Sequence, residues 1–450
     1  MTMARQAGAR TGVWRLMAYS LAAVPLAMAA LPIYVNVPKF YADVIGLNLF
    51  AIGGLLLAAR AFDAIQDPLL GYWSDRTRDT RFGRRIWMVA GAPMLAISML
   101  GLFNPPVLTA DLMMWWLLAM LLVVYTSFSM LQISYQAHGA EMSDDPFERT
   151  RIVSYREGFG LLGVFLAAAL PQVLSAKYGA REGYAVFAII FIPLLLAMVA
   201  VTVWLSPPAK VREQAVVRNA FRNMLLPLKN LPFRQLLTVF VFNGIAATIP
   251  ATLVLFFIED VIKAPAQAAL LLIVYFAAGA AGMPVWVWLS SRIGKARAWL
   301  VGMMVSILAF IWAFMLGAGD VGAFAVICML SGLGLGADLA LPPSMLADVI
   351  DEDEKNGLGR NEGAYFGLWN LATKMNLALA AGIALPMLAL LGYVPRASNQ
   401  AQSLFYLATI YAILPCVLKA IAAVILLRSP LLRGPRREQA GHPIFTEAYK

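Results

Sequence analysis

The sequence is poor in charged residues and in residues that bind metals through sulfur or nitrogen. Charged side chains make up only 13% of its 450 residues, whereas soluble domains carry about 25%. It has two histidines and two cysteines, and Cys328 and Cys416 have neither metal-ligand nor disulfide spacing. We also find no phosphate-binding loop with its lysine and no nucleophile–base arrangement. We therefore expect neither an enzyme nor an ATP-driven pump, and no bound cofactor.

Apolar residues dominate instead, at 61% of the chain with a mean hydropathy of +0.74. A helix of about 20 apolar residues spans a bilayer. The sequence predicts an all-α membrane protein with twelve such helices. We expect them near Trp14–Asn36, Asn48–Trp73, Ile86–Asn104, Leu112–Ala137, Glu157–Leu174, Tyr184–Leu205, Leu236–Ile258, Gln267–Leu289, Ala298–Leu316, Val321–Leu346, Gly363–Leu391 and Gln402–Leu427.

Arginine and lysine concentrate in the two tails and in every second loop. The loop between the second and third helices, for example, holds Arg76, Arg78, Arg81, Arg84 and Arg85. Basic residues accumulate on the cytoplasmic side of membrane proteins. We therefore expect both termini in the cytoplasm. The net charge of +10 then reflects membrane orientation, and we expect no nucleic-acid partner.

A long basic connection divides the chain into two groups of six helices. The expected units are residues 1–206 and 236–428 as bundles, 207–235 as a cytoplasmic loop and 429–450 as a cytoplasmic tail. The segment DPLLGYWSDR at 67–76 also aligns without gaps to MPVWVWLSSR at 283–292. Such an internal echo suggests two bundles related by an axis along the membrane normal, as in major facilitator transporters.

Two carboxylates lie inside the second predicted helix. Asp63 and Asp67 are four residues apart and so share one helix face, where each costs roughly 2.5–3.5 kcal/mol in a membrane. The same alignment of the two halves places Gly279 and Met283 at the positions that correspond to Asp63 and Asp67. The carboxylate pair is absent from the second half, so the fold itself does not require it. We interpret it as a cation site. The alternative is a structural ion pair between Asp63 and Arg60, which leaves Asp67 unexplained.

Other polar residues in or beside the helices are candidates for the same chemistry. Carboxylate and hydroxyl oxygens bind such cations, and Thr126 is our third cation ligand. Arg156 and Lys374 could face a central cavity. The alternatives are that Arg156 anchors its loop through Glu141, Asp144 or Glu148, and that Lys374 pairs with an aspartate in the membrane. We expect Lys419 to reach the membrane surface. The remaining candidates are Trp369, Tyr125 and Gln132 for substrate contact or packing, and Asp75, Arg76, Arg84, Arg85, Asp348 and Asp351 for gating latches.

Several blocks resemble the glycoside–pentoside–hexuronide:cation symporters, a major facilitator family that includes melibiose permease. They are FDAIQDPLLGYWSDRTRDTRFGRR at 62–85, YTSFSM at 125–130, ERTRIVSYR at 148–156 and RNEGAYFGLWNLATK at 360–374. The resemblance implies that Asp63 and Asp67 bind the coupling cation with help from Thr126, and that Arg156 and Lys374 lie at the cavity. Ala27 and Ser129 stand where the permease has sugar-binding aspartates, so we expect a different substrate, with Ser129 beside it.

The resulting expectation is a Na⁺- or H⁺-coupled symporter of the inner membrane. It would be a monomer that imports a glycoside, a uronic acid or a related small organic solute by alternating access. Setting Asp63 and Asp67 against Arg60, Arg156 and Lys374 gives the cavity an excess of positive charge, which favours an anionic solute. Three alternatives stay open: a lysophospholipid-type lipid transporter, an uncoupled facilitator or antiporter of the same fold, and a non-transporting membrane sensor.

Overall fold

The computed structural model describes residues 12–77, 83–143, 146–207, 226–355, 362–395, 397 and 399–433, and these residues form helices and short connections. Twelve helical segments among them are long and apolar enough to span a membrane. The predicted all-α class with twelve spans is therefore confirmed. The first span consists of α1 (Val13–Ser20), α2 (Ala23–Lys39) and a π-helical turn, and the last consists of α14 (Ala401–Ala408), a second π-helical turn and α15 (Leu414–Arg428).

Each of the other spans is built on a single α-helix. Two of them also include a 3₁₀ segment, Pro265–Gln267 before α10 and Ile311–Met315 after α11. In the first half they are α3 (Leu49–Arg76), α4 (Arg85–Phe103), α5 (Ala110–Glu141), α6 (Pro146–Tyr178) and α7 (Ala180–Leu205). In the second half they are α9 (Leu231–Asp260), α10 (Ala268–Ile293), α11 (Lys295–Phe310), α12 (Val321–Lys355) and α13 (Glu362–Leu390).

Several helices extend beyond the apolar segments that predicted them. Helix α12 continues to Lys355, because hydropathy reports only the part of a helix that lies in the membrane. Helix α9 begins at Leu231, before the expected Leu236, since Asn230 caps it by accepting a hydrogen bond from the Phe233 amide at 3.0 Å. The same Asn230 side chain donates to Asp353 on α12 at 3.0 Å.

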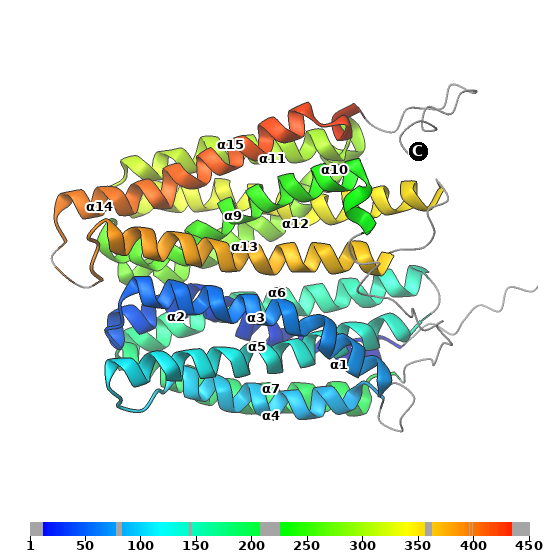
Figure 1. The fold of residues 1–450 in the computed structure, drawn as a ribbon, viewed down its shortest axis with the longest axis horizontal. Helices are drawn as coiled ribbons and strands as arrows, with labels where there is room; N and C mark the ends of the chain where they lie inside the picture. The colour runs from blue at the N-terminus through cyan, green and yellow to red at the C-terminus, as the bar shows by residue number, and fades with distance from the viewer. Residues whose placement is uncertain are drawn as a thin grey trace, which may run out of the picture.

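Helices α1–α7 and α9–α15 form two groups that lie side by side (Figure 1). We call them the first and second halves. An even number of spans returns the chain to its starting side, so the start of α1 and the end of α15 lie at one end of the molecule (Figure 1). We call this the terminal end, and the opposite one the far end.

The halves pack closely toward the far end. A Cβ atom on Gly53 of α3 would lie 2.6 Å from Cδ of Pro386 on α13, so only glycine permits this approach. Gly382 of α13 lies similarly against Leu57. One buried apolar cluster spans both halves and includes Val37 of α2 with Ile258 of α9. A separate cluster within the second half contains residues near the terminal end of its helices, such as Phe233.

Candidate functional site

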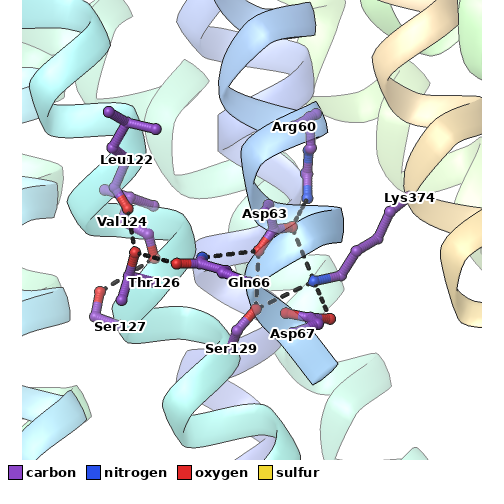
Figure 2. Close-up of polar contacts among 10 residues, drawn as sticks. All are labelled: Arg60, Asp63, Gln66, Asp67, Leu122, Val124, Thr126, Ser127, Ser129 and Lys374. Atoms are coloured by element: carbon purple, nitrogen blue, oxygen red, sulfur yellow. Dashed lines mark hydrogen bonds and ion pairs between the residues drawn. The ribbon is translucent and has the colours of Figure 1, made fainter. Parts of the chain in front are cut away.

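The two halves share an ion-pair cluster between α3 and α13 (Figure 2). Asp63 is 1% exposed, and one of its carboxylate oxygens lies 2.9 Å from the Lys374 ammonium nitrogen. Lys374 also forms an ion pair with Asp67. A single cation from the second half therefore bridges both carboxylates of the first half. The structure thus contains the pairing of Lys374 that the sequence left as an alternative.

Ser129 of α5 connects the same groups. Its hydroxyl donates to Oδ1 of Asp63 at 3.0 Å and accepts from the Lys374 ammonium at 3.1 Å. Arg60, the other expected partner of Asp63, lies at 3.5 Å. The Arg60 guanidinium stands over the Tyr125 ring at 4.1 Å, where the cation interacts with the π system. Tyr125 is thus buried beneath Arg60.

Thr126 does not contact either aspartate directly. Its hydroxyl lies 2.8 Å from Oε1 of Gln66, and the Gln66 amide donates to Oδ1 of Asp63 at 3.4 Å. Gln66 therefore links the candidate threonine to the carboxylate (Figure 2). Sequence reasoning missed Gln66, although it follows Asp63 by three residues and so shares its helix face.

One carboxylate oxygen of the cluster has no partner. Oδ1 of Asp67 is buried and accepts no hydrogen bond from the described residues. An unsatisfied buried acceptor is unfavourable, and a charged one more so. The formal charges of Asp63, Asp67, Lys374 and Arg60 sum to zero. The cluster is thus electrically balanced, yet it keeps an oxygen ligand available.

The remaining candidates for substrate contact lie apart from these ion pairs. Arg156 pairs with the neighbouring Glu157 at 2.6 Å, which removes the excess positive charge that we expected at the cavity. Trp369 is buried and stacks on Phe240 with ring centroids 3.9 Å apart, so it packs within the second half. Gln132 is half-buried on α5 and forms no hydrogen bond with the described residues.

The described gating candidates connect helices of the same half. Arg84 donates to the Ser74 hydroxyl at 3.3 Å, and Arg85 donates to the Ser206 carbonyl at 3.1 Å. Asp348 pairs with Lys295 at 2.6 Å. Other members of these predictions lie outside the described residues or have side chains outside them: Asp75, Arg76 and Asp351, and the loop-anchoring alternatives Glu141, Asp144 and Glu148.

An ion pair that sequence reasoning missed joins the halves at the far end. Lys39 of α2 pairs with Glu259 of α9 and, at 2.6 Å, with Asp43 of its own segment. Beside it, the Tyr393 hydroxyl donates to Asp260. Burial, and then the Asp260 carboxylate, raise the pKa of Tyr393, which keeps this hydroxyl protonated. The far end is therefore closed by charge as well as by packing.

The second half contains its own buried ion pair. Lys419 of α15 lies 2.8 Å from Asp338 of α12, and Asn243 of α9 accepts from Lys419 at 2.7 Å. The Trp299 indole donates to Asp338 at 2.8 Å. The expectation that Lys419 reaches the membrane surface is therefore wrong, because a buried carboxylate holds the ammonium inside the bundle. Asp338, an acidic residue inside a predicted span, was the signal for this pair.

Comparison with known proteins agrees with this architecture. A family model described as MFS/sugar transport protein matches residues 16–433. The isoprimeverose transporter of Lactiplantibacillus pentosus is 24% identical over 401 residues, which cover 86% of this chain and 82% of the relative. The sodium-dependent lysophosphatidylcholine symporter 1 of Gallus gallus is 24% identical over 440 residues, covering 88% and 82%.

A solved structure has the same fold. The crystal structure of a D-xylose-proton symporter matches with a TM-score of 0.70 and 13% identity, over 94% of this chain and 100% of that chain. At this identity the likeness concerns the fold alone. The family model covers most of the sequence, and the fold, the twelve spans and the resemblance of the sequence blocks agree with it. The chain therefore belongs to the MFS/sugar transport protein family and is a multi-pass membrane transporter, not an enzyme.

Proposed function

We propose that this protein is a Na⁺- or H⁺-coupled symporter whose coupling cation binds at Asp63 and Asp67. The observation that carries the proposal is the ammonium of Lys374 held between these two carboxylates. Carboxylates inside a membrane are retained where they serve an ion or proton pathway. Here a tethered cation occupies the position that a free cation needs.

A free cation would replace Lys374 at the carboxylates. Asp63 and Asp67 supply charged oxygens, Oδ1 of Asp67 has no other partner, and the Ser129 hydroxyl is already oriented toward Asp63. Hydroxyl and carboxylate oxygens suit a hard cation such as Na⁺. A proton on one carboxylate would weaken the same ion pair, so H⁺ can serve in its place. Thr126 contributes through Gln66, which it holds against Asp63.

Coupling follows from the position of Lys374 on the opposite half. When the cation binds, the ammonium is released and the contact between α3 and α13 weakens. A solute that binds the freed Lys374 side chain then favours cation binding, and the reverse holds equally. Each positive charge that enters gains about 2.3 kcal/mol per 100 mV of membrane potential, which can drive uphill uptake.

We place the terminal end in the cytoplasm because the basic residues concentrate there. The structure is then closed toward the outside by Gly53–Pro386 packing and the Lys39–Glu259 pair. The two halves rock about the Lys374 cluster to alternate access. We assign the protein to the inner membrane, as a monomer with both termini in the cytoplasm.

The substrate is a glycoside, a uronic acid or a related small organic solute. The name of the Lactiplantibacillus relative supports a sugar, and the name of the Gallus relative supports sodium coupling. That second name also keeps a lysophospholipid as the alternative substrate class. An uncoupled facilitator is the other alternative, and it would leave Asp63 and Asp67 without an ion to bind.

Uptake by proteoliposomes tests the proposal. Candidate glycosides, uronates and lysophosphatidylcholine are offered with an inward Na⁺ gradient, an inward H⁺ gradient or neither. We expect accumulation above the external concentration with one of the two gradients, and its loss in Asp67→Asn with exchange of solute retained. Equal uptake without any gradient would identify a facilitator.

A further inference from the structure

A partly open cavity of about 90 Å³ lies mainly between α9, α10, α11, α12 and α15 of the second half. It does not contain Asp63, Asp67 or Lys374, so it is separate from the proposed cation site. Its lining is largely aliphatic and aromatic and includes Ala251, Leu272, Phe276, Phe310 and Leu335. Both cysteines of the chain, Cys328 and Cys416, also line it.

The polar groups in the cavity wall are mostly occupied by other protein groups. The Ser306 hydroxyl donates to the Gly302 carbonyl at 3.0 Å, and the Ser331 hydroxyl donates to the Ile327 carbonyl at 2.7 Å. Asp338 and Lys419 are bonded to one another at 2.8 Å. The hydroxyls of Tyr275 and Tyr411 also line the cavity, and among the described residues no hydrogen bond joins them to another group, so these two can pair with a polar atom of a ligand. A sugar ring has more hydroxyls than these two groups can pair, and the rest of the wall is largely apolar, so the wall suits a short apolar group better than a whole sugar ring.

The cavity reaches the boundary between the two halves. Val35 of α2 belongs to the first half and lines it. At its polar end, Lys419 is bonded to Asn243, and the next residue, Gly244, lies against Asn376 on the helix that carries Lys374. A ligand bound between the halves can therefore extend into this cavity.

We propose that the cavity binds a short apolar group carried by the transported solute, such as the propyl or butyl group of an alkyl glycoside. The inference rests on the proposed transport function and narrows its substrate to amphiphilic molecules. A protein cavity of about 150 Å³ accommodates benzene. The smaller volume here suits a group below that size, and it excludes most of a long acyl chain.

Binding of n-alkyl β-D-glucosides from methyl to dodecyl to the protein in lipid nanodiscs tests the size limit, with thermal stabilisation as the readout. We expect affinity to rise about fourfold per methylene, the effect of burying one CH₂, up to butyl and then to stop rising. Equal affinity for the methyl and butyl compounds overturns the proposal. Affinity that continues to rise through dodecyl overturns the size limit and favours a lipid-type substrate.

Two variants should shift the preferred alkyl-chain length in opposite directions. Ala251→Leu reduces the cavity and should favour shorter chains, whereas Leu272→Ala enlarges it and should favour longer ones. Ala281→Leu places the same side chain on an exposed face of α10 and should change nothing. Misfolding cannot produce opposite shifts, and an unchanged preference in both cavity variants contradicts the proposal.

Xenon provides a probe that needs no sugar. Crystals pressurised with xenon should show it in this cavity in the wild type and not in Ala251→Leu, and an empty wild-type cavity overturns the proposal. The cation site is tested separately by Asp67→Asn, which should remove Na⁺ dependence and leave the chain-length preference unchanged. Failure of the transport proposal and failure of the cavity proposal are thereby distinguished.

Discussion

The ammonium nitrogen of Lys374 lies 2.9 Å from a carboxylate oxygen of Asp63. One residue belongs to α13 and the other to α3, so this ion pair joins the two halves inside the membrane-spanning region (Figure 2). A cation that binds at Asp63 must compete with a charge supplied by the protein.

Removal of the tethered charge should strengthen cation binding. In Lys374→Gln no ammonium competes for the carboxylates, so we expect the apparent Na⁺ affinity to rise about tenfold, or 1.4 kcal/mol. We also expect that added solute no longer increases the Na⁺ affinity of this variant. Isothermal titration with NaCl at fixed ionic strength measures this change. Lys374→Arg keeps the positive charge, so its Na⁺ affinity should stay below that of Lys374→Gln. A fall in Na⁺ affinity in the glutamine variant would mean that Lys374 supports the site.

Loss of the second carboxylate should abolish coupling without unfolding the protein. Asp67→Asn removes a charged ligand whose Oδ1 has no other partner among the described residues, so we expect Na⁺-dependent thermal stabilisation to disappear. Thermal unfolding with and without NaCl, at matched choline chloride, is the measurement. Asp111→Asn, at an exposed position near the start of α5, serves as the control. Full Na⁺ stabilisation in Asp67→Asn would contradict the assignment.

Adjacent glycines on α3 should respond differently to alanine. A Cβ on Gly53 would meet Pro386 at 2.6 Å, whereas nothing lies within 4 Å of one on Gly54. Gly53→Ala should therefore destabilise this state by about 1–3 kcal/mol through overpacking. Gly54→Ala should be neutral, or stabilise the helix by up to roughly 1 kcal/mol. Chemical denaturation in detergent compares the two, and equal effects would be evidence against close packing of α3 on α13.

The far-end ion pair should hold this conformation closed. Glu259→Gln removes the attraction to Lys39 across the halves and leaves the Lys39–Asp43 pair intact, so we expect a larger open fraction at the far end. The opening is measured as the distance between spin labels at Asn48→Cys in the first half and Ala266→Cys in the second half, in a Cys328→Ser and Cys416→Ser background. Glu182→Gln, an exposed carboxylate at the same end, is the control. An unchanged distance distribution would remove the gating role.

The buried pair in the second half should show strong coupling. Lys419→Met leaves Asp338 buried without its cation and should cost about 3–5 kcal/mol, whereas Lys419→Met with Asp338→Leu should recover most of that loss. Lys295→Met breaks the more exposed Lys295–Asp348 pair and should cost at most about 1 kcal/mol. Equilibrium unfolding of the wild type, Lys419→Met, Asp338→Leu and the double variant forms the cycle. Additive effects would mean that the two charges do not interact.

Local patterns in the chain were sufficient for several conclusions. Apolar runs of membrane-spanning length predicted twelve helices, which the structure contains, because a helix satisfies its own backbone inside lipid whatever its neighbours are. The spacing of Asp63 and Asp67 placed both on one face of α3, since i and i+4 positions are fixed by helix geometry. The sequence blocks around them identified the family.

Tertiary structure decided which charges meet. Lys374 and Asp63, Lys419 and Asp338, and Lys39 and Glu259 are each far apart in the chain. Their contacts depend on how helices pack and rotate against one another, which no local pattern specifies. The same packing set apart a cavity in the second half and put Gln66 between Thr126 and Asp63. Helix identity thus followed from short-range chemistry, whereas the partners of each buried charge followed from the assembly of the two halves.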